Sequence, residues 1–364
     1  MPKYLENLND EIRHYFSILS PEFPNWLLDY IDTPEMERIG KISIGCGTDY
    51  TKVFNTRYWY SNLDHSVGVA LIIWHFTKDK KQTLAGLFHD IATPVFKHVV
   101  DFLNGDHEKQ ESTEEKTTEI IKNSKQIMEL LKKDGIKLEE VNDYKIYPIA
   151  DNETPKLAAD RFEYTFSSGL VFHRVWDMSD IKECYENVVI LKNEDGIDEL
   201  GFENLLVGEK YISIISKLWP SWITNSDKAV MQFLADMIKE IYQKGFIDLE
   251  DLYVLSEEEI IDKILNCDDE ILSEKFKSFQ NSTKVYDSEE FIEDKYCVSV
   301  KSKRRYIIPL VQNDNIVKII NDVSMNAQKD INDYFNFTTT KYAYFDFEPF
   351  ITDQKKLLKS QKLV

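Results

Sequence analysis

Paired cysteines of the kind that hold zinc or exchange disulfides are lacking from this chain. Its four cysteines, Cys46, Cys184, Cys267 and Cys297, lie far apart, and no two have CxxC spacing. A zinc knuckle and a dithiol redox motif are therefore not indicated. We expect reduced, structural thiols, as in a cytoplasmic protein.

A long apolar run is lacking as well. Residues 1–20 mix charged and apolar side chains. The apolar run over residues 67–74 is far shorter than the roughly 20 residues that cross a bilayer as a helix. We therefore expect no signal peptide, no membrane span and no membrane partner.

Positive charge is scarce. The 364 residues include 44 Lys and Arg against 64 Asp and Glu, which gives a formal net charge of −20. Because the electrostatic field of a negatively charged chain repels polyanions, general nucleic-acid binding is not expected. A small phosphorylated substrate is compatible with this net charge, since a metal ion and a few nearby cations reverse the field locally. A conspicuous basic cluster either binds an anion such as a regulatory nucleotide or pairs with nearby acids. It consists of Lys301, Lys303, Arg304 and Arg305.

Helical periodicity, by contrast, is present over most of the chain. Apolar residues recur at helix spacing through much of residues 1–270. Residues 298–311 and 338–351 are rich in aromatic and β-branched side chains, which is typical of strands. We predict a mainly α-helical body over residues 1–270 and a smaller mixed α/β segment over residues 271–364.

Three positions predict where helices in this body begin. Asp64 is expected to cap one helix at its N-terminus. Pro94 is expected to begin a helix that ends near Leu103, and Pro155 to begin the helix that carries Asp160.

Two histidines and two aspartates have the character of metal ligands. His65 lies in an apolar stretch, His89 and Asp90 are adjacent, and Asp160 follows at a distance. Imidazole and carboxylate ligands suit Mn, Fe, Ni or Zn and, less naturally, Mg. A bound ion would lower the pKa of its water and neutralise charge developing on phosphorus. The alternative is a pair of hydrogen-bonded core histidines, because an isolated His-Asp dipeptide means little.

The order of these four residues resembles the ligand pattern of the HD-domain metal-dependent phosphohydrolases, and most closely the branch of deoxynucleoside triphosphate triphosphohydrolases. In that branch the His-Asp pair opens the motif HDxGHxPFxH, and this chain has HDIATPVFKH over residues 89–98. The resemblance covers residues 40–175 well and residues 210–310 loosely. It implies an HD-domain helical bundle, with its metal-site core over residues 40–175, that holds one divalent metal ion. The ligands that it implies are His65, His89, Asp90 and Asp160.

The resemblance also implies residues that move protons. His107, followed by Glu108, is similar to a downstream His-Glu of the family, which makes His107 a general acid or proton shuttle and Asp101 the carboxylate that orients it. His98 matches the last His of the motif and is placed with these catalytic residues. A His with a carboxylate partner suits proton transfer near neutral pH. The alternative for His107 is an exposed residue of the turn that follows Asn-Gly-Asp.

The substrate side of the resemblance rests on the segment DRFEY over residues 160–164, which is similar to DKWDY of the family. On that likeness Arg161 contacts phosphate and Tyr164 lines a nucleotide pocket. Thr93, which replaces the middle His of the motif, is assigned to the substrate too. The alternative pairs Arg161 with a neighbouring acid and places Tyr164 in the core.

Two departures from the family pattern concern the substrate. Asn62 stands where the triphosphate hydrolases have an Arg, and Ser168 stands where they have an Asp that helps to hold the sugar. A monophosphate or another phosphorylated metabolite is then as credible as a deoxynucleoside triphosphate. We predict a metal-dependent phosphohydrolase that attacks a nucleotide or related phosphate ester with metal-activated water. The alternative is a catalytically degenerate HD scaffold that binds a nucleotide and regulates. Related enzymes self-associate, which implies a homo-oligomer.

Overall fold

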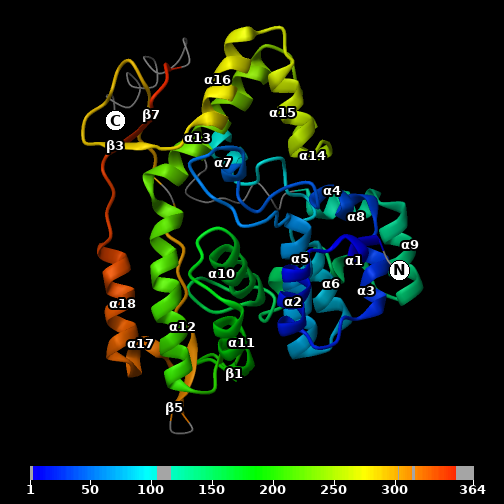
Figure 1. Cartoon of the computed structure of the whole chain (residues 1–364). Helices are drawn as coiled ribbons and strands as arrows, with labels where there is room; N and C mark the ends of the chain where they lie inside the picture. The colour runs from blue at the N-terminus through cyan, green and yellow to red at the C-terminus, as the bar shows by residue number, and fades with distance from the viewer. Residues whose placement is uncertain (1–2, 105–115, 302, 314–315, 350–364) are drawn as a thin grey trace.

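A computed structural model describes residues 3–104, 116–301, 303–313 and 316–349. It shows a mainly helical molecule with small sheets, which confirms the predicted predominance of helix (Figure 1). Among the described residues, no helix combines the length and apolar character that crossing a membrane requires.

Helices account for nearly all the regular structure of the first half of the chain. They are α1 (Lys3–Asn7), α2 (Asp10–Leu19), α3 (Asn25–Ile31), α4 (Pro34–Ile39), α5 (Asn62–Thr77), α6 (Lys80–Phe88), α7 (Val99–Asn104), α8 (Thr117–Asn123), α9 (Lys125–Asp134) and α10 (Ala159–Val171). Single 3-10 turns are η1 (Thr48–Tyr50), η2 (Leu138–Glu140) and η3 (Tyr144–Ile146).

The second half alternates helices with short strands. Its helices are α11 (Met178–Glu186), α12 (Leu205–Leu218), η4 (Trp219–Ile223), α13 (Asn225–Gln243), α14 (Asp251–Val254), α15 (Glu257–Leu265), α16 (Glu270–Asn281), α17 (Ile320–Val323) and α18 (Met325–Asn336). Its strands are β1 (Val188–Lys192), β2 (Asp198–Phe202), β3 (Tyr286–Ser288), β4 (Tyr296–Val298), β5 (Leu310–Asn313), β6 (Ile316–Ile319) and β7 (Tyr342–Phe345).

Helix α10 lies at the centre of the molecule. It packs on α5 on one side and on α12 on the other, and α12 in turn packs along α18 (Figure 1). The facing side chains are apolar and fully buried, among them Val67 of α5 and Phe162 and Phe166 of α10. Burial of each such side chain contributes about 1.5–3 kcal/mol relative to exposure, so this packing fixes α5 and α10 relative to each other.

Two apolar cores hold the chain together, and the C-terminal segment contributes to both. Ile307 and Val311 belong to the core around α5 and α10. Tyr296 and Phe345 belong to a second core around α7, α13, α15 and α16. In that core the rings of Phe233 and Phe279 stack with centroids 4.5 Å apart.

The two sheets join segments that are distant in the sequence. β1 and β2 form an antiparallel hairpin, β5 pairs parallel with β2 (Gly201 opposite Leu310), and β6 completes this sheet. The second sheet has the order β3-β7-β4. Strands on either side of residue 270 therefore share a sheet, and the division of the chain there stays a prediction.

Three predicted helix starts were wrong. α5 begins at Asn62, because Ser61 is its N-cap and Asp64, in the third helical position, accepts a hydrogen bond from the Ser61 N–H at 2.8 Å. α7 begins only at Val99, not at Pro94, since φ angles of 61° and 49° at Phe96 and Lys97 interrupt the helix.

The third wrong start is that of α10, which begins at Ala159 rather than Pro155. Pro155 lies before the helix, and its carbonyl accepts a hydrogen bond from the Ile308 N–H at 2.8 Å. The hairpin of β1 and β2 was also missed, because it lies in the stretch interpreted as helical. Its turn holds Asp195-Gly196, with Gly196 at φ 75°, and this turn pair was the available signal.

Candidate metal centre

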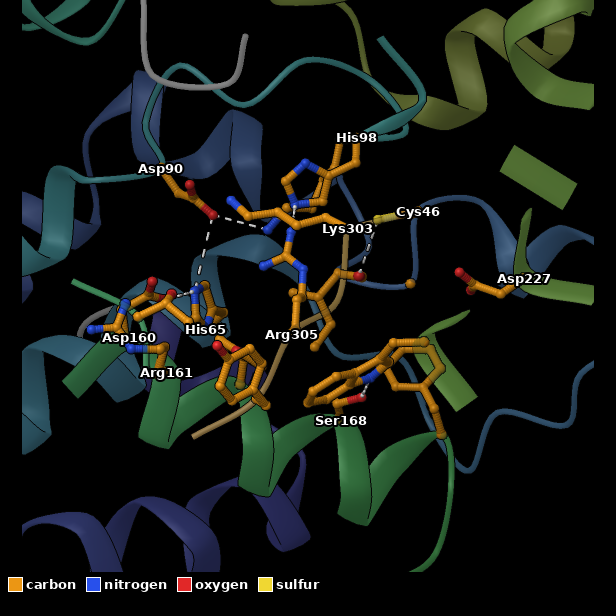
Figure 2. A pocket seen from close by; sticks show the side chains of 18 of the residues that line it. Cys46, His65, Asp90, His98, Asp160, Arg161, Ser168, Asp227, Lys303 and Arg305 are labelled. Carbon is orange, nitrogen blue, oxygen red and sulfur yellow. Dashed lines mark hydrogen bonds and ion pairs between the residues drawn. The ribbon is translucent and has the colours of Figure 1, made fainter. Parts of the chain in front are cut away.

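Three predicted ligands converge from three different helices. His65 lies on α5, His89 caps the C-terminus of α6, and Asp160 lies in the first turn of α10. The Nε2 atom of His65 lies 3.2 Å from Nε2 of His89 and 3.2 Å from Oδ1 of Asp160. One ligand atom from each lies within 4.8 Å of the others. Figure 2 shows His65 beside Asp160. Two imidazoles and a carboxylate in this arrangement fit a divalent transition metal.

Asp90 joins the same cluster. Its Oδ2 atom lies 3.7 Å from Nε2 of His89 and 4.0 Å from Nε2 of His65. Adjacent residues point about 100° apart inside a helix; His89 and Asp90 converge because α6 ends at Phe88. The structure thus brings all four predicted ligands together.

Both aspartates remain ionised in this buried cluster. Burial acts to raise their pKa values, but Lys97 beside Asp90 and His65 beside Asp160 outweigh it and hold both pKa values well below the usual range. An ionised pair of carboxylates next to two imidazoles favours a bound cation.

A buried glutamate that sequence analysis did not single out orients His65. Glu163 is fully buried, and its carboxylate accepts hydrogen bonds from the hydroxyls of Tyr15 at 3.2 Å and Tyr60 at 2.6 Å. The same carboxylate forms a close hydrogen bond with Nδ1 of His65. That bond leaves Nε2 of His65 directed at the cluster, as in many metal-binding histidines. His89 is held similarly, by its Nδ1 contact with the Gly86 carbonyl at 2.7 Å.

Lys97 is a second residue that sequence analysis missed. Its backbone is left-handed, with φ 49°, and its buried ammonium lies 2.9 Å from Oδ2 of Asp90. The ammonium also contacts Oδ1 of Asn62. A cation therefore reaches the place where Asn62 replaces the Arg expected from the family pattern. The left-handed turn at Phe96 and Lys97 directs the Lys97 side chain inward. The sequence pattern did not predict this turn.

The predicted substrate residues have different surroundings. Arg161 and Tyr164 line a cavity of about 370 Å³ that also contains the four candidate ligands. Arg161 forms an ion pair with Asp151 at 2.9 Å, the partner that the alternative interpretation required. The ring of Tyr164 contacts that of Trp222, with centroids 5.3 Å apart. Thr93 is fully buried and outside the cavity wall, with its hydroxyl 3.1 Å from Nδ2 of Asn62.

The predicted proton-transfer residues are only partly described. His107 lies outside the described residues, so its role and its pairing with Asp101 stay predictions. Asp101 contacts Nδ1 of His98 at 2.9 Å, while Nε2 of His98 accepts a hydrogen bond from Arg305 at 3.1 Å. Burial lowers the pKa of His98 and, with Arg305, outweighs the opposing effect of Asp101. His98 is therefore neutral at physiological pH.

The basic cluster of the C-terminal segment lies at the same cavity. Lys303, Arg304 and Arg305 line it, whereas Lys301 is exposed. Arg305 lies over the Tyr164 ring, 5.8 Å from its centroid. In Figure 2, Arg305 lies between His65 and Asp227. Sequence analysis identified this cluster but did not connect it with the candidate ligands.

Comparisons with known sequences give distant likenesses. No protein-family model matches the chain. It is 23% identical over 264 residues to the uncharacterized protein YdhJ of Bacillus subtilis, covering 72% of this chain and 77% of that protein. It is also 23% identical over 155 residues to the metal-dependent phosphohydrolase cns2 of Cordyceps militaris, covering 41% of this chain and 42% of that protein.

Solved structures show the same fold. A hypothetical protein from Aquifex aeolicus matches 89% of this chain and 93% of its own length, with a TM-score of 0.61 and 16% identity. A phosphohydrolase from Bacteroides thetaiotaomicron matches 89% of this chain and 96% of its own length, with a TM-score of 0.62 and 15% identity. Together with the candidate His-His-Asp site, these likenesses support a metal-dependent phosphohydrolase in general terms.

Proposed function

We propose that this protein is an HD-domain phosphohydrolase that cleaves a small phosphorylated substrate, a nucleotide or a related phosphate ester. The convergence of His65, His89, Asp90 and Asp160 in one cavity carries the proposal. A divalent ion bound there would supply an activated water and neutralise charge on phosphorus. The donors fit such an ion: two imidazole nitrogens and two ionised carboxylates meet in one buried cluster.

The surrounding cations suit a phosphate group. Lys97 lies beside Asp90, and Arg305 and Lys303 line the cavity nearby. Their charges offset the chain's net charge of −20 at this place, so a phosphorylated ligand meets a locally favourable field. Charge-assisted hydrogen bonds to phosphate oxygens are roughly twice as strong as neutral ones.

Phosphate release from a panel of substrates tests the proposal. The purified chain, reconstituted with Mn, is incubated with nucleoside mono- and triphosphates and simple phosphate esters. We expect metal-dependent release of orthophosphate, pyrophosphate or triphosphate from at least one of them. Triphosphate release from deoxynucleotides would support the triphosphohydrolase branch, whereas orthophosphate release from monophosphates would indicate a nucleotidase. If none of these substrates releases phosphate above the level of a metal-free control, the proposal is contradicted.

A regulatory HD scaffold is the second candidate, and the surroundings of Arg161 favour it. This guanidinium bonds to Asp151 at 2.9 Å, to the Lys156 carbonyl at 2.7 Å and to the Asn152 carbonyl at 2.6 Å. Donors engaged in this way are less available to a phosphate. This candidate predicts nucleotide binding without turnover, and self-association of the chain stays a prediction under either one.

A further inference from the structure

The cavity has a second end that the proposed chemistry does not use. Figure 2 shows Asp227 on the opposite side of the cavity from Asp160. Aromatic side chains line the cavity besides the metal cluster, and a ring of Trp222 touches that of Tyr164. These aromatic residues include Phe54, Tyr164, Phe172 and Trp222. These rings can make apolar contacts with a planar group of a ligand, which the charged metal cluster cannot.

The carboxylate of Asp227 lies in this wall and has no hydrogen-bond partner among the described residues. Among residues 3–104, 116–301, 303–313 and 316–349, no hydrogen bond or ion pair involves its side-chain oxygens. Arg305 is nearby but bonds to His98, and Lys228 bonds to the hydroxyl of Thr339 at 3.2 Å. Burial raises the pKa of Asp227 to about 7 against the effects of these two cations.

The local sequence offers Asp227 a structural role that it does not take. Thr224 caps α13, and Asp227 follows three residues later, as in a capping box. At α5 the equivalent Asp64, and at α15 the equivalent Glu259, bonds back to the N-cap N–H. At α13 the Thr224 hydroxyl accepts from the Asp227 N–H at 3.4 Å, but the carboxylate makes no return bond and lines the cavity.

An unpaired, partly buried carboxylate is costly to the free protein. Leaving such a group without a hydrogen-bond partner carries a free-energy cost, which is larger when the group is charged. A ligand that donates hydrogen bonds to it recovers that cost on binding. Since aromatic rings line the same cavity, the matching ligand group is a planar ring with N–H donors.

We propose that Asp227 is a specificity-determining residue that accepts a hydrogen bond from the exocyclic amino group of a heterocyclic base seated among Phe54, Phe172 and Trp222. The proposal rests on the proposed function, in which the phosphate of the same ligand lies at the metal cluster. It narrows the substrate class to phosphorylated nucleosides with an amino-bearing base. A carboxylate favours such bases over those that present a carbonyl oxygen at the same position, because two acceptors repel each other.

Binding of unphosphorylated nucleosides tests this proposal without turnover. Titration calorimetry of the full chain in chelator at pH 8.5, where Asp227 with its pKa of about 7 is ionised, compares adenosine with inosine, guanosine with inosine, and cytidine with uridine. We expect the amino-bearing member of at least one pair to bind about tenfold or more tightly, the value of a charged hydrogen bond. Asp227→Asn should remove that preference, and Glu240→Gln, a carboxylate-to-amide change elsewhere on α13, should keep it.

Several outcomes would overturn the proposal. They are the absence of nucleoside binding, the absence of any preference within the pairs, and a preference that survives in Asp227→Asn. Equal weakening of both members of every pair would also overturn it, because the carboxylate would then contact the sugar. Circular dichroism checks the fold of each variant, and Asp227→Ser serves as a second test if Asp227→Asn does not fold. Phosphate release is measured separately, so its failure rejects the proposed function and leaves the binding result to be judged alone.

Discussion

Single buried side chains set the chemistry of the candidate metal centre at the residue scale. Glu163 joins the hydroxyls of Tyr15 and Tyr60 to Nδ1 of His65. Because one carboxylate holds all three, the imidazole has a fixed tautomer and orientation before any ion arrives. A ligand held in this way binds metal without a further loss of side-chain freedom.

Replacing this carboxylate should weaken metal binding. We expect Glu163→Gln to lower metal affinity about 10- to 100-fold, because the amide keeps the volume but lacks the charge that supports His65. Competition with a chromophoric chelator measures the affinity. Glu199→Gln, a buried carboxylate of β2, is the matched control and should leave it within about twofold. Equal affinities of Glu163→Gln and the wild type would show that Glu163 does not support the metal ligand.

Asp227 should make the free protein less stable at high pH. Its pKa is about 7 in the folded chain against an ordinary 3.8, so the folded state binds the proton more tightly than the unfolded state. Stability from this group is therefore present below about pH 4 and is lost as pH rises through about 7. We expect Asp227→Asn to raise Tm by about 2 °C or more at pH 8 and to have little effect at pH 4. A Tm gain that is equal at both pH values would contradict the shifted titration.

Sequence reasoning at this scale identified the candidate ligands but not the residues that orient them. His65, His89, Asp90 and Asp160 stand out because their types and order form a pattern along the chain. Glu163 and Lys97 do not, since their roles depend on how α10 packs on α5 and on a left-handed turn. Tertiary packing decides such contacts, and local sequence does not encode it.

At the scale of elements, the close approach of α5 and α10 builds the site. Gly68 makes this approach possible, because a Cβ at that position would lie 2.8 Å from Cγ of Glu163. The glycine follows His65 by about one turn of α5, so it faces the carboxylate that orients this histidine.

A single methyl group at Gly68 should therefore disturb the metal site. We expect Gly68→Ala to displace Glu163 and lower both Tm and metal affinity, although Ala normally stabilises a helix relative to Gly by roughly 0.5–1 kcal/mol. Gly208→Ala on α12 is the control, since its Cβ would lie 2.9 Å from a Val311 methyl group. It should lower Tm only. Equal metal affinities of the two variants would argue against this role of the helix contact.

Helix content was predictable, but several boundaries were not. Apolar periodicity identified the helical body of the chain. The starts of α5 and α7 were wrong because a reciprocal cap and two left-handed residues act over only a few positions. The short hairpin of β1 and β2 was overlooked between longer helical stretches, because each strand has only five residues and neither alternates regularly between buried and exposed side chains.

At the scale of the whole molecule, the C-terminal segment completes the cavity. Its strand β5 pairs with β2. Residues 303–306, which precede β5 in the chain, lie along the cavity wall. Arg305 contacts His98 and lies over Tyr164, whereas Arg304 bonds to the carbonyls of Tyr334 at 2.9 Å and Phe337 at 2.7 Å. The sequence showed the basic cluster, but only the chain's long-range pairing places it beside the candidate ligands.

The two neighbouring arginines should therefore differ in their effects. We expect Arg305→Ala to raise KM for a phosphorylated substrate about tenfold with a small change in Tm, because it removes a cation from the cavity. Arg304→Ala should mainly lower Tm, since it removes the guanidinium donor from two backbone carbonyls. Steady-state kinetics and thermal unfolding of both variants measure this. Indistinguishable KM values would show that Arg305 does not contact the substrate.

The first experiment compares the wild type with the double variant His89→Ala/Asp90→Ala. Metal content and phosphate release of both show whether these residues form the metal site of a phosphohydrolase. We expect about one divalent ion per wild-type chain, and phosphate release that chelator abolishes and added metal restores. The double variant should lose both, with its helical circular dichroism unchanged. Phosphate release by the double variant at the wild-type rate, or a wild-type chain that binds no metal after reconstitution, would contradict a metal-dependent phosphohydrolase built on these residues.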